Sequence, residues 1–230
     1  MNTRKAISTN LKMSKLYTWT PEHFYFYIPR ITADFFGYPV QTVVIPKDDE
    51  RTKDKEWIAK KGHGKFPIFE DENGEVIYES GAIAAHIARV SGNEDFLGNS
   101  AWERAEVNQF VSVGLSGAMP SNIKVVYNVF GFKNDAASYG EGVEAIQKQA
   151  KLLESALGEK DWFVGGRFTL ADLVLFVTLA PAFSFVLDAA FREEIPNLAA
   201  WFEKVSKLPA VAGVAGYIKP CEQALKPAFK

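Results

Sequence analysis

Cysteine is almost missing from the chain: Cys221 is the single thiol among 230 residues. One thiol cannot form an internal disulfide bond or a four-thiolate metal site, and such scarcity is typical of a reducing compartment. The three histidines, His23, His63 and His86, show neither an HxxxH motif nor a Cys/His spacing. We therefore expect a cytoplasmic protein without a bound metal.

An excess of positive charge is also missing, because 26 lysine and arginine residues stand against 28 aspartate and glutamate residues. Without a basic surplus, direct binding of nucleic acid is not expected. Long apolar runs are lacking too. The longest, 170–187, contains Asp172, Thr178 and Pro181 and falls short of the about 20 apolar residues of a membrane span. It predicts a buried core helix, and no association with a membrane is expected.

The first segment, residues 1–14, lacks the apolar run of about 7–15 residues that a secretory signal needs. It carries Arg4, Lys5 and Lys12 but no acidic residue, as mitochondrial presequences do. Two interpretations stay open: such a presequence, or a disordered extension before a start-like Met13. We expect the disordered extension.

What is present is a globular composition, with 47% apolar and 23% charged residues. In the first part of the chain, strands are predicted at 16–19 and 40–45, with a helix inside 22–36 that Gly37 closes. Pro29 interrupts this helical span, because proline removes a helical hydrogen bond. The helix is therefore expected to begin either at the start of the span or only near Pro29.

A β-hairpin is predicted next, with strands 66–71 and 75–78 joined at Asn73-Gly74. These two residues tolerate the positive φ angles of a type I′ turn. Ser80 then precedes apolar residues at helical spacing, and it is predicted to be the N-cap of that helix.

The pattern changes near residue 91, after which every periodic segment predicts a helix. The chain is thus divided into an α/β unit at 15–91, a linker at 92–99 and an all-helical unit at 100–230. Thr169 and Asp172 have the spacing of a capping box, which predicts a structural role at the start of the buried helix.

Two short segments carry groups suited to a peptide ligand. A cis proline at the entrance to a strand, Pro67, would leave the backbone groups of Phe66 free to pair with an extended peptide. Glu79 and Ser80, at a helix N-terminus, add a carboxylate for an amine, and a hydroxyl with open N–H groups for a carboxylate. A strand-initiating proline and an ordinary serine N-cap explain the same residues, so both interpretations stay open on residue types alone.

These motifs together resemble the cytosolic glutathione transferases, over about residues 15–225. Within that superfamily the chain is most similar to the transferase-like domain of the gamma subunits of eukaryotic translation elongation factor one. The matching segments are 16–18, 79–84, 164–172, 191–202 and 216–222. The resemblance implies the cytosolic glutathione transferase fold, an α/β thioredoxin-like N-terminal domain followed by an all-α C-terminal domain.

The resemblance also implies glutathione as ligand or substrate. The residues that would bind it are Lys65, Phe66, Pro67, Glu79, Ser80 and His63. The main chain of Phe66 would hold the cysteinyl backbone, Lys65 would approach the glycyl carboxylate, and Glu79 with Ser80 would hold the γ-glutamyl end. For His63, which lies between two glycines, a solvated loop position is the default interpretation.

A group that activates the thiol is not fixed by the resemblance. In catalytic relatives a Tyr, Ser or Cys near the start of the first helix interacts with the sulfur, and a hydroxyl there lowers a thiol pKa that starts near about 8.5. Here that position falls near His23, which has no hydroxyl, and Tyr17, Thr18 and Thr20 lie close by. All four stay candidates. The aromatic run 24–27 is predicted either to line an electrophile pocket or to pack at the domain interface.

The leading functional hypothesis is a scaffold subunit of the elongation factor one complex that binds glutathione, with weak transferase activity left open. Its expected partners are the nucleotide-exchange subunits of that complex and a second copy of the chain in a homodimer. The alternative is a stand-alone enzyme that conjugates glutathione to electrophiles. A third hypothesis is an assembly domain like those appended to some aminoacyl-tRNA synthetases.

Overall fold

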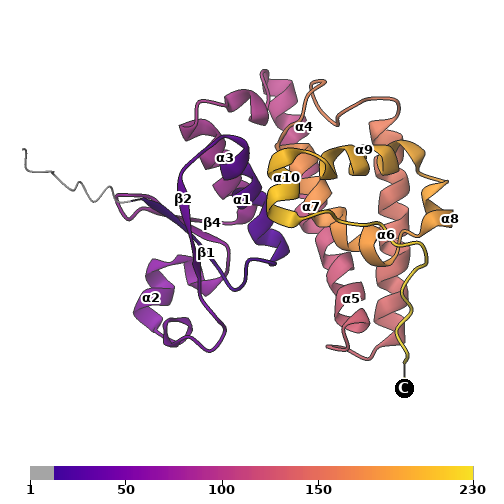
Figure 1. Cartoon of the computed structure of the whole chain (residues 1–230), viewed down its shortest axis with the longest axis horizontal. Helices are drawn as coiled ribbons and strands as arrows, with labels where there is room; N and C mark the ends of the chain where they lie inside the picture. The colour runs from indigo at the N-terminus through magenta and orange to yellow at the C-terminus, as the bar shows by residue number, and fades with distance from the viewer. Residues whose placement is uncertain (1–12, 230) are drawn as a thin grey trace, which may run out of the picture.

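The computed structural model describes residues 13–229, so most of the predicted extension lies outside the described residues. Its first part contains β1 Ser14–Thr18, α1 Phe24–Phe35, β2 Val40–Val44, η1 Glu50–Thr52, α2 Lys55–Lys60, η2 Gly62–Gly64, β3 Ile68–Glu70, β4 Val76–Tyr78 and α3 Ser80–Val90. Its second part contains η3 Glu94–Leu97, α4 Ala101–Ser112, η4 Val113–Ala118, α5 Met119–Val129, α6 Ala136–Leu157, α7 Leu170–Phe185, α8 Ala189–Arg192, α9 Pro196–Ser206 and α10 Pro209–Ala215. The expected order, a thioredoxin-like unit followed by helices, is confirmed (Figure 1).

The sheet has the strand order β2-β1-β3-β4, with β1 parallel to β2 and antiparallel to β3. Successive residues of a strand point to opposite faces. Leu16 and the facing Phe69 belong to the core with α1 and α3, whereas Tyr17 and Ile68 pack on the other face near α2. The two faces of the sheet therefore have separate apolar clusters.

Helix α1 runs without a break from Phe24 through Pro29, so the alternative start near Pro29 is wrong. Because proline has no backbone N–H, one helical hydrogen bond is missing, the one to the carbonyl of Tyr25 in the first turn. The ring of Pro29 is buried in the core. The predicted end at Gly37 is confirmed. Gly37 has φ 64, and the N–H groups of Gly37 and the next residue donate to carbonyls of the last turn, as in a Schellman motif.

The hairpin is confirmed, but its turn differs from the predicted type I′ turn at Asn73-Gly74. The N–H of Gly74 donates to the carbonyl of Asp71, and of the two predicted turn residues Gly74 alone has positive φ. The Asp71 carboxylate accepts bonds from the N–H groups of Asn73 and Glu75, which organises the turn from one side chain.

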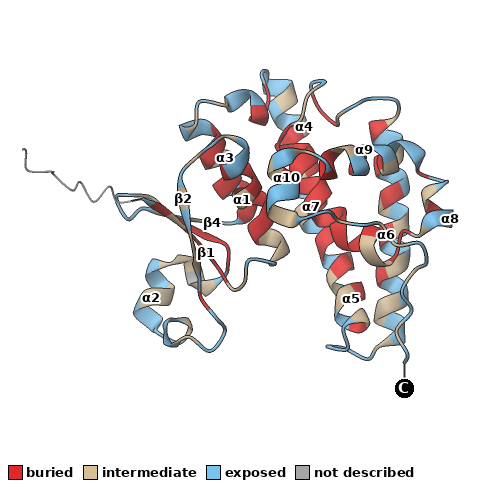
Figure 2. Cartoon of the chain, viewed as in Figure 1, coloured by how far each residue is buried: buried red, intermediate tan, exposed pale blue. Residues whose placement is uncertain are grey.

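Helix α7 is the centre of the helical unit, and its residues from Leu170 to Phe183 are all buried (Figure 2). The predicted capping box of Thr169 and Asp172 is confirmed at its start. The Asp172 carboxylate, 0% exposed, also accepts bonds at 3.0 Å from the N–H of Phe163 and from the indole of Trp201. Burial raises the pKa of Asp172, and the bonds donated to it act in the opposite direction.

A π-helical turn, η4, interrupts the long helix between α4 and α5. At Gly114 a Cβ atom would lie 2.9 Å from side-chain atoms of Thr178 and Val174 on α7, so only glycine permits this close approach. The side chain of Gln149 donates to the carbonyl of Val113 at 3.1 Å and satisfies one backbone group of the irregular turn.

Among residues 13–229, no helix combines the length and the apolar character of a membrane span. The run 170–187 forms the buried helix that was predicted from it. His86, on α3, is half-buried and packs against Phe69, with 5.3 Å between the centres of the two rings.

Candidate functional site

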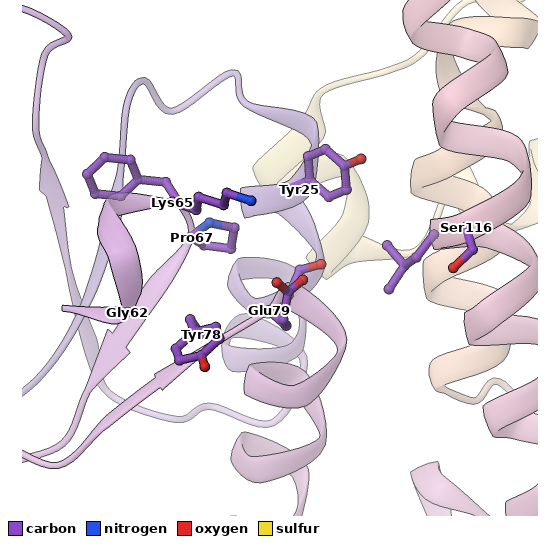
Figure 3. Close-up of a pocket in the computed structure, with 10 residues that line it drawn as sticks. Tyr25, Gly62, Lys65, Pro67, Tyr78, Glu79 and Ser116 are labelled. Atoms are coloured by element: carbon purple, nitrogen blue, oxygen red, sulfur yellow. The ribbon is translucent and has the colours of Figure 1, made fainter. Parts of the chain in front are cut away.

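A cavity of about 540 Å³ opens between the sheet unit and the helical unit (Figure 3). Its lining residues are Tyr25, Gly62, Lys65, Phe66, Pro67, Tyr78, Glu79, Ser80, Leu115 and Ser116. Five of the six residues predicted to bind glutathione therefore lie around one cavity. The sixth, His63, belongs to η2, and its side chain lies outside the described part of the structure.

The floor of the cavity on the sheet side comes from the segment before β3. The Phe66–Pro67 peptide bond is cis, as predicted. The ring of Phe66 packs away into the second apolar cluster, 4.6 Å from the ring of Trp19, and the strand ladder begins only at Ile68. Phe66 thus offers the cavity its main chain, and the exposed Lys65 beside it supplies a positive charge.

The N-terminus of α3 forms the opposite wall, and here the prediction of Ser80 as N-cap is wrong. Glu79 is the N-cap, with φ 72 and no side-chain capping bond, while Ser80 is the first helical residue and 2% exposed. The first α-helical bond runs from the N–H of Ile83 to the carbonyl of Glu79. The backbone N–H groups of the three residues before Ile83 therefore donate no hydrogen bond within the helix. A carboxylate is favoured at such an end.

Tyr25, in the first turn of α1, is the residue of this cavity that the sequence did not single out as a thiol-activating candidate. Burial raises the pKa of its phenol, and the negative charge of Glu79 acts in the same direction. The phenol therefore stays protonated near neutral pH and can donate a hydrogen bond. Its position two residues after His23, near the start of the first helix, could have indicated a thiol-activating hydroxyl. Packing at the domain interface, however, explained the aromatic run 24–27 equally well.

The four predicted thiol-activating candidates lie outside this cavity. Tyr17 points to the α2 face of the sheet, where its hydroxyl donates to the Glu70 carboxylate. Thr18 is fully buried and donates to the backbone carbonyl of Thr20, whose own hydroxyl donates to a neighbouring carboxylate. His23, the N-cap of α1, lines a different cavity.

The contact of Tyr17 belongs to a small charged cluster behind the sheet. Lys61 forms an ion pair with Glu70 at 2.6 Å, and its ammonium also lies over the Tyr17 ring. Burial raises the pKa of Tyr17, with the bond to Glu70 adding to it. Burial alone would raise the pKa of Glu70 as well, but the bonds from Lys61 and Tyr17 outweigh it and hold that pKa below its usual 4.5.

Two further walls were not predicted. Leu115 and Ser116 reach the cavity from the π-helical turn, and Figure 3 shows Ser116 across the cavity from Glu79. On the sheet side, Gly62 has φ 64 and packs so closely against Tyr78 that a Cβ atom would lie 2.6 Å from its ring.

The cavity thus joins a cation, a carboxylate, a helix N-terminus, a protonated phenol and an open stretch of main chain. Such a set suits an extended ligand that carries both signs of charge. No cluster of three or more His, Cys, Asp or Glu residues that would suit a metal ion was found in the part of the chain that is described.

Comparison with known families gives two matches that follow the two units. The family model for the glutathione S-transferase N-terminal domain matches residues 14–89, and the one for the glutathione S-transferase C-terminal domain matches residues 109–209. The linker predicted between the two units, residues 92–99, lies between the two matched ranges.

Among curated proteins, the elongation factor 1-gamma of Artemia salina is 32% identical over 213 residues, which cover 91% of this chain and 48% of that protein. The elongation factor 1-gamma of Homo sapiens is 30% identical over 212 residues, which cover 90% and 47%. The chain therefore spans about half the length of the curated relatives it matches.

Two solved structures share the fold. The GST-like domain of elongation factor 1-gamma from Saccharomyces cerevisiae has a TM-score of 0.80 at 18% identity and covers 94% of this chain and 99% of that one. Glutathione S-transferase I bound with lactoylglutathione has a TM-score of 0.78 at 21% identity and covers 89% and 99%.

Proposed function

The chain belongs to the glutathione S-transferase family, and from that membership we propose that its interdomain cavity binds glutathione. The main chain of Phe66 pairs with the cysteinyl backbone, and Lys65 attracts the glycyl carboxylate. Glu79 binds the γ-glutamyl amine, while Ser80 and the N-terminus of α3 bind the γ-glutamyl carboxylate. The observation that carries this proposal is that these four residues, from two separate segments, line one cavity.

Calorimetric titration of glutathione into the protein and three variants tests this proposal. Because a hydrogen bond to a charged group contributes about 1.5–3 kcal/mol, Glu79→Ala should weaken binding by about tenfold or more. Ser80→Ala should weaken it by a smaller factor. The control Glu75→Ala removes an exposed carboxylate of the hairpin, outside the cavity, and should bind as the parent does. Unchanged affinity in both Glu79→Ala and Ser80→Ala would overturn the assignment.

We propose further that the chain acts in the cytoplasm as a scaffold subunit of the elongation factor one complex. The support is the identity of about 30% with elongation factor 1-gamma proteins over 90% of the chain. Its partners would be the nucleotide-exchange subunits and a second copy of the chain. Co-expression with those subunits followed by size-exclusion chromatography tests the complex, and analytical ultracentrifugation of the chain alone tests the homodimer. Separate elution of every subunit would contradict the scaffold proposal.

A stand-alone transferase is the second candidate, and Tyr25 favours it. Its protonated hydroxyl lines the same cavity as Phe66 and Glu79, where it would donate a hydrogen bond to the glutathione sulfur. The thiolate would then attack a ring carbon of an aromatic halide, the halide ion would leave with its electron pair, and the thiol proton would pass to solvent. Turnover of glutathione with an aromatic halide should fall at least about tenfold in Tyr25→Phe.

The matched control is Tyr27→Phe, which removes the same group from the same helix outside the cavity. Equal turnover in the two variants would show that Tyr25 does not act on the sulfur. Turnover by the parent without assembly with the exchange subunits would favour the enzyme over the scaffold.

A further inference from the structure

The segment 61–66, which connects α2 to β3, carries part of the wall of the interdomain cavity. Gly62 and Lys65 both line the cavity from this segment (Figure 3). Gly62 and Gly64 have φ 64 and 69, and glycine adopts other backbone conformations about as readily. The position of Lys65 therefore depends on how the two ends of the segment are held.

The first end is held by Lys61, the C-cap residue of α2, whose side chain lies behind the sheet. Its side chain is only 15% exposed, which is rare for a lysine without a partner. The ammonium group lies 2.6 Å from Oε2 of Glu70 on β3 and 5.5 Å from the centre of the Tyr17 ring on β1. The Tyr17 hydroxyl donates to the same oxygen atom of Glu70. Groups from two strands thus converge on the end of α2.

Stability alone is a weak reason for this ion pair, because apolar residues of similar volume often replace a buried pair without loss. The Trp57 ring already attaches α2 to the sheet, with its centre 6.3 Å from the Tyr17 ring and 6.4 Å from the Phe66 ring. An apolar contact permits several arrangements, whereas the ammonium of Lys61 has to reach one carboxylate oxygen. The ion pair therefore fixes where the segment begins.

We propose that Lys61 is a positioning residue for the glutathione site, which holds the segment 61–66 through Glu70 so that Lys65 faces the glycyl carboxylate. This role rests on the proposed binding of glutathione. Lys61 is not among the residues that line the cavity, so it acts on the ligand only through the segment. The γ-glutamyl end is bound by α3, which the segment does not carry, and its binding should not depend on Lys61.

Two ligands separate the two ends of the site. In the glycyl ethyl ester of glutathione the glycyl carboxylate is neutral, while the γ-glutamyl end is unchanged. We expect calorimetric titration to show that the parent binds glutathione about two- to fivefold more tightly than the ester, as an exposed ion pair with Lys65 allows. In Lys61→Met, which keeps the length of the side chain and loses the charge, this ratio should fall close to one. A general loss of folding would weaken the binding of both ligands alike and leave the ratio unchanged.

The matched control is Lys60→Met, which removes the same charge from the exposed residue next to Lys61 and should keep the ratio of the parent. Lys61→Arg retains a cation and should keep most of it. If Lys61→Met does not fold, Glu70→Gln removes the other charge of the pair and should also lower the ratio. An unchanged ratio in the variant that folds, or an equal fall in Lys60→Met, would overturn the proposal.

Failure of the proposed function and failure of this role are separate results. A parent that binds neither ligand, or that binds both equally, contradicts the glutathione site as proposed. A parent that prefers glutathione over the ester supports the site, and the comparison with Lys61→Met then decides the role of Lys61.

Discussion

The N-cap of α3 gives the sharpest test of the site, because Glu79 has φ 72, in a region that favours glycine. Of the described residues other than glycine, Glu79 alone has positive φ. A side chain held there costs about 1–3 kcal/mol, and such strain is commonly found at ligand sites. Replacing Glu79 with glycine should remove that cost, whereas replacing it with alanine should keep it.

The expected difference follows from two opposing effects. Glycine has more freedom in the unfolded chain and is less stable than alanine by about 0.5–1 kcal/mol at an ordinary helical position. At an N-cap glycine is preferred to alanine for reasons other than φ. Both effects also act at Leu208, the N-cap of α10, which has φ −61 and no side-chain capping bond. At each of the two positions, the glycine and alanine variants differ in their free energy of unfolding. The amount by which this difference at Glu79 exceeds the difference at Leu208 is therefore the cost of the strained backbone.

We expect this excess to be about 1 kcal/mol or more, which corresponds to a Tm difference of about 2–4 °C in a chain of this size. Thermal and urea unfolding of the four variants measures it. Both Glu79 variants lack the carboxylate, so both should lose glutathione affinity while their stabilities differ. If the pair at Glu79 differs by no more than the pair at Leu208, the backbone at Glu79 is not strained and the reasoning fails.

Three further variants test the fold around the site. Gly114→Ala should lower the free energy of unfolding by about 1–3 kcal/mol, because the added methyl group meets α7. The control Gly140→Ala has no atom within 4 Å of the new Cβ and should raise the free energy of unfolding by about 0.5–1 kcal/mol. Similar effects of the two variants in urea unfolding would contradict the close packing at Gly114. Asp172→Ala should cost more than about 3 kcal/mol, because several buried donors lose their acceptor, and a cost below about 1 kcal/mol would speak against that role. The pKa of Glu70 is lowered in the folded state, so its carboxylate contributes stability above pH 4.5 that is lost as the pH falls through the folded-state pKa. Glu70→Gln should lack this part of the acid dependence of the free energy of unfolding. The same pH dependence in the parent and in Glu70→Gln would refute this contribution.

Local patterns predicted the features that depend on neighbouring residues. The capping box at Thr169 and Asp172 and the helix end at Gly37 are both of this kind, since each needs only a few consecutive residues. The start of α1 was left open because the buried ring of Pro29 is stabilised by the core, which a local pattern does not contain. Ser80 was taken as the N-cap because serine is a common one, whereas the chain reaches α3 through the positive φ of Glu79.

The missed residues of the cavity have a common cause, which is that distant segments place them. Ser116 faces the first domain because the helix between α4 and α5 forms a π-helical turn there, and that turn lies where Gly114 approaches α7. Tyr25 faces the same space because α1 begins at Phe24 and not at Pro29. The first placement depends on the packing of the π-helical turn against α7 within the helical unit, and the second on the core that buries Pro29. Substitutions at Gly114 should therefore change glutathione affinity as well as stability, although Gly114 does not line the cavity.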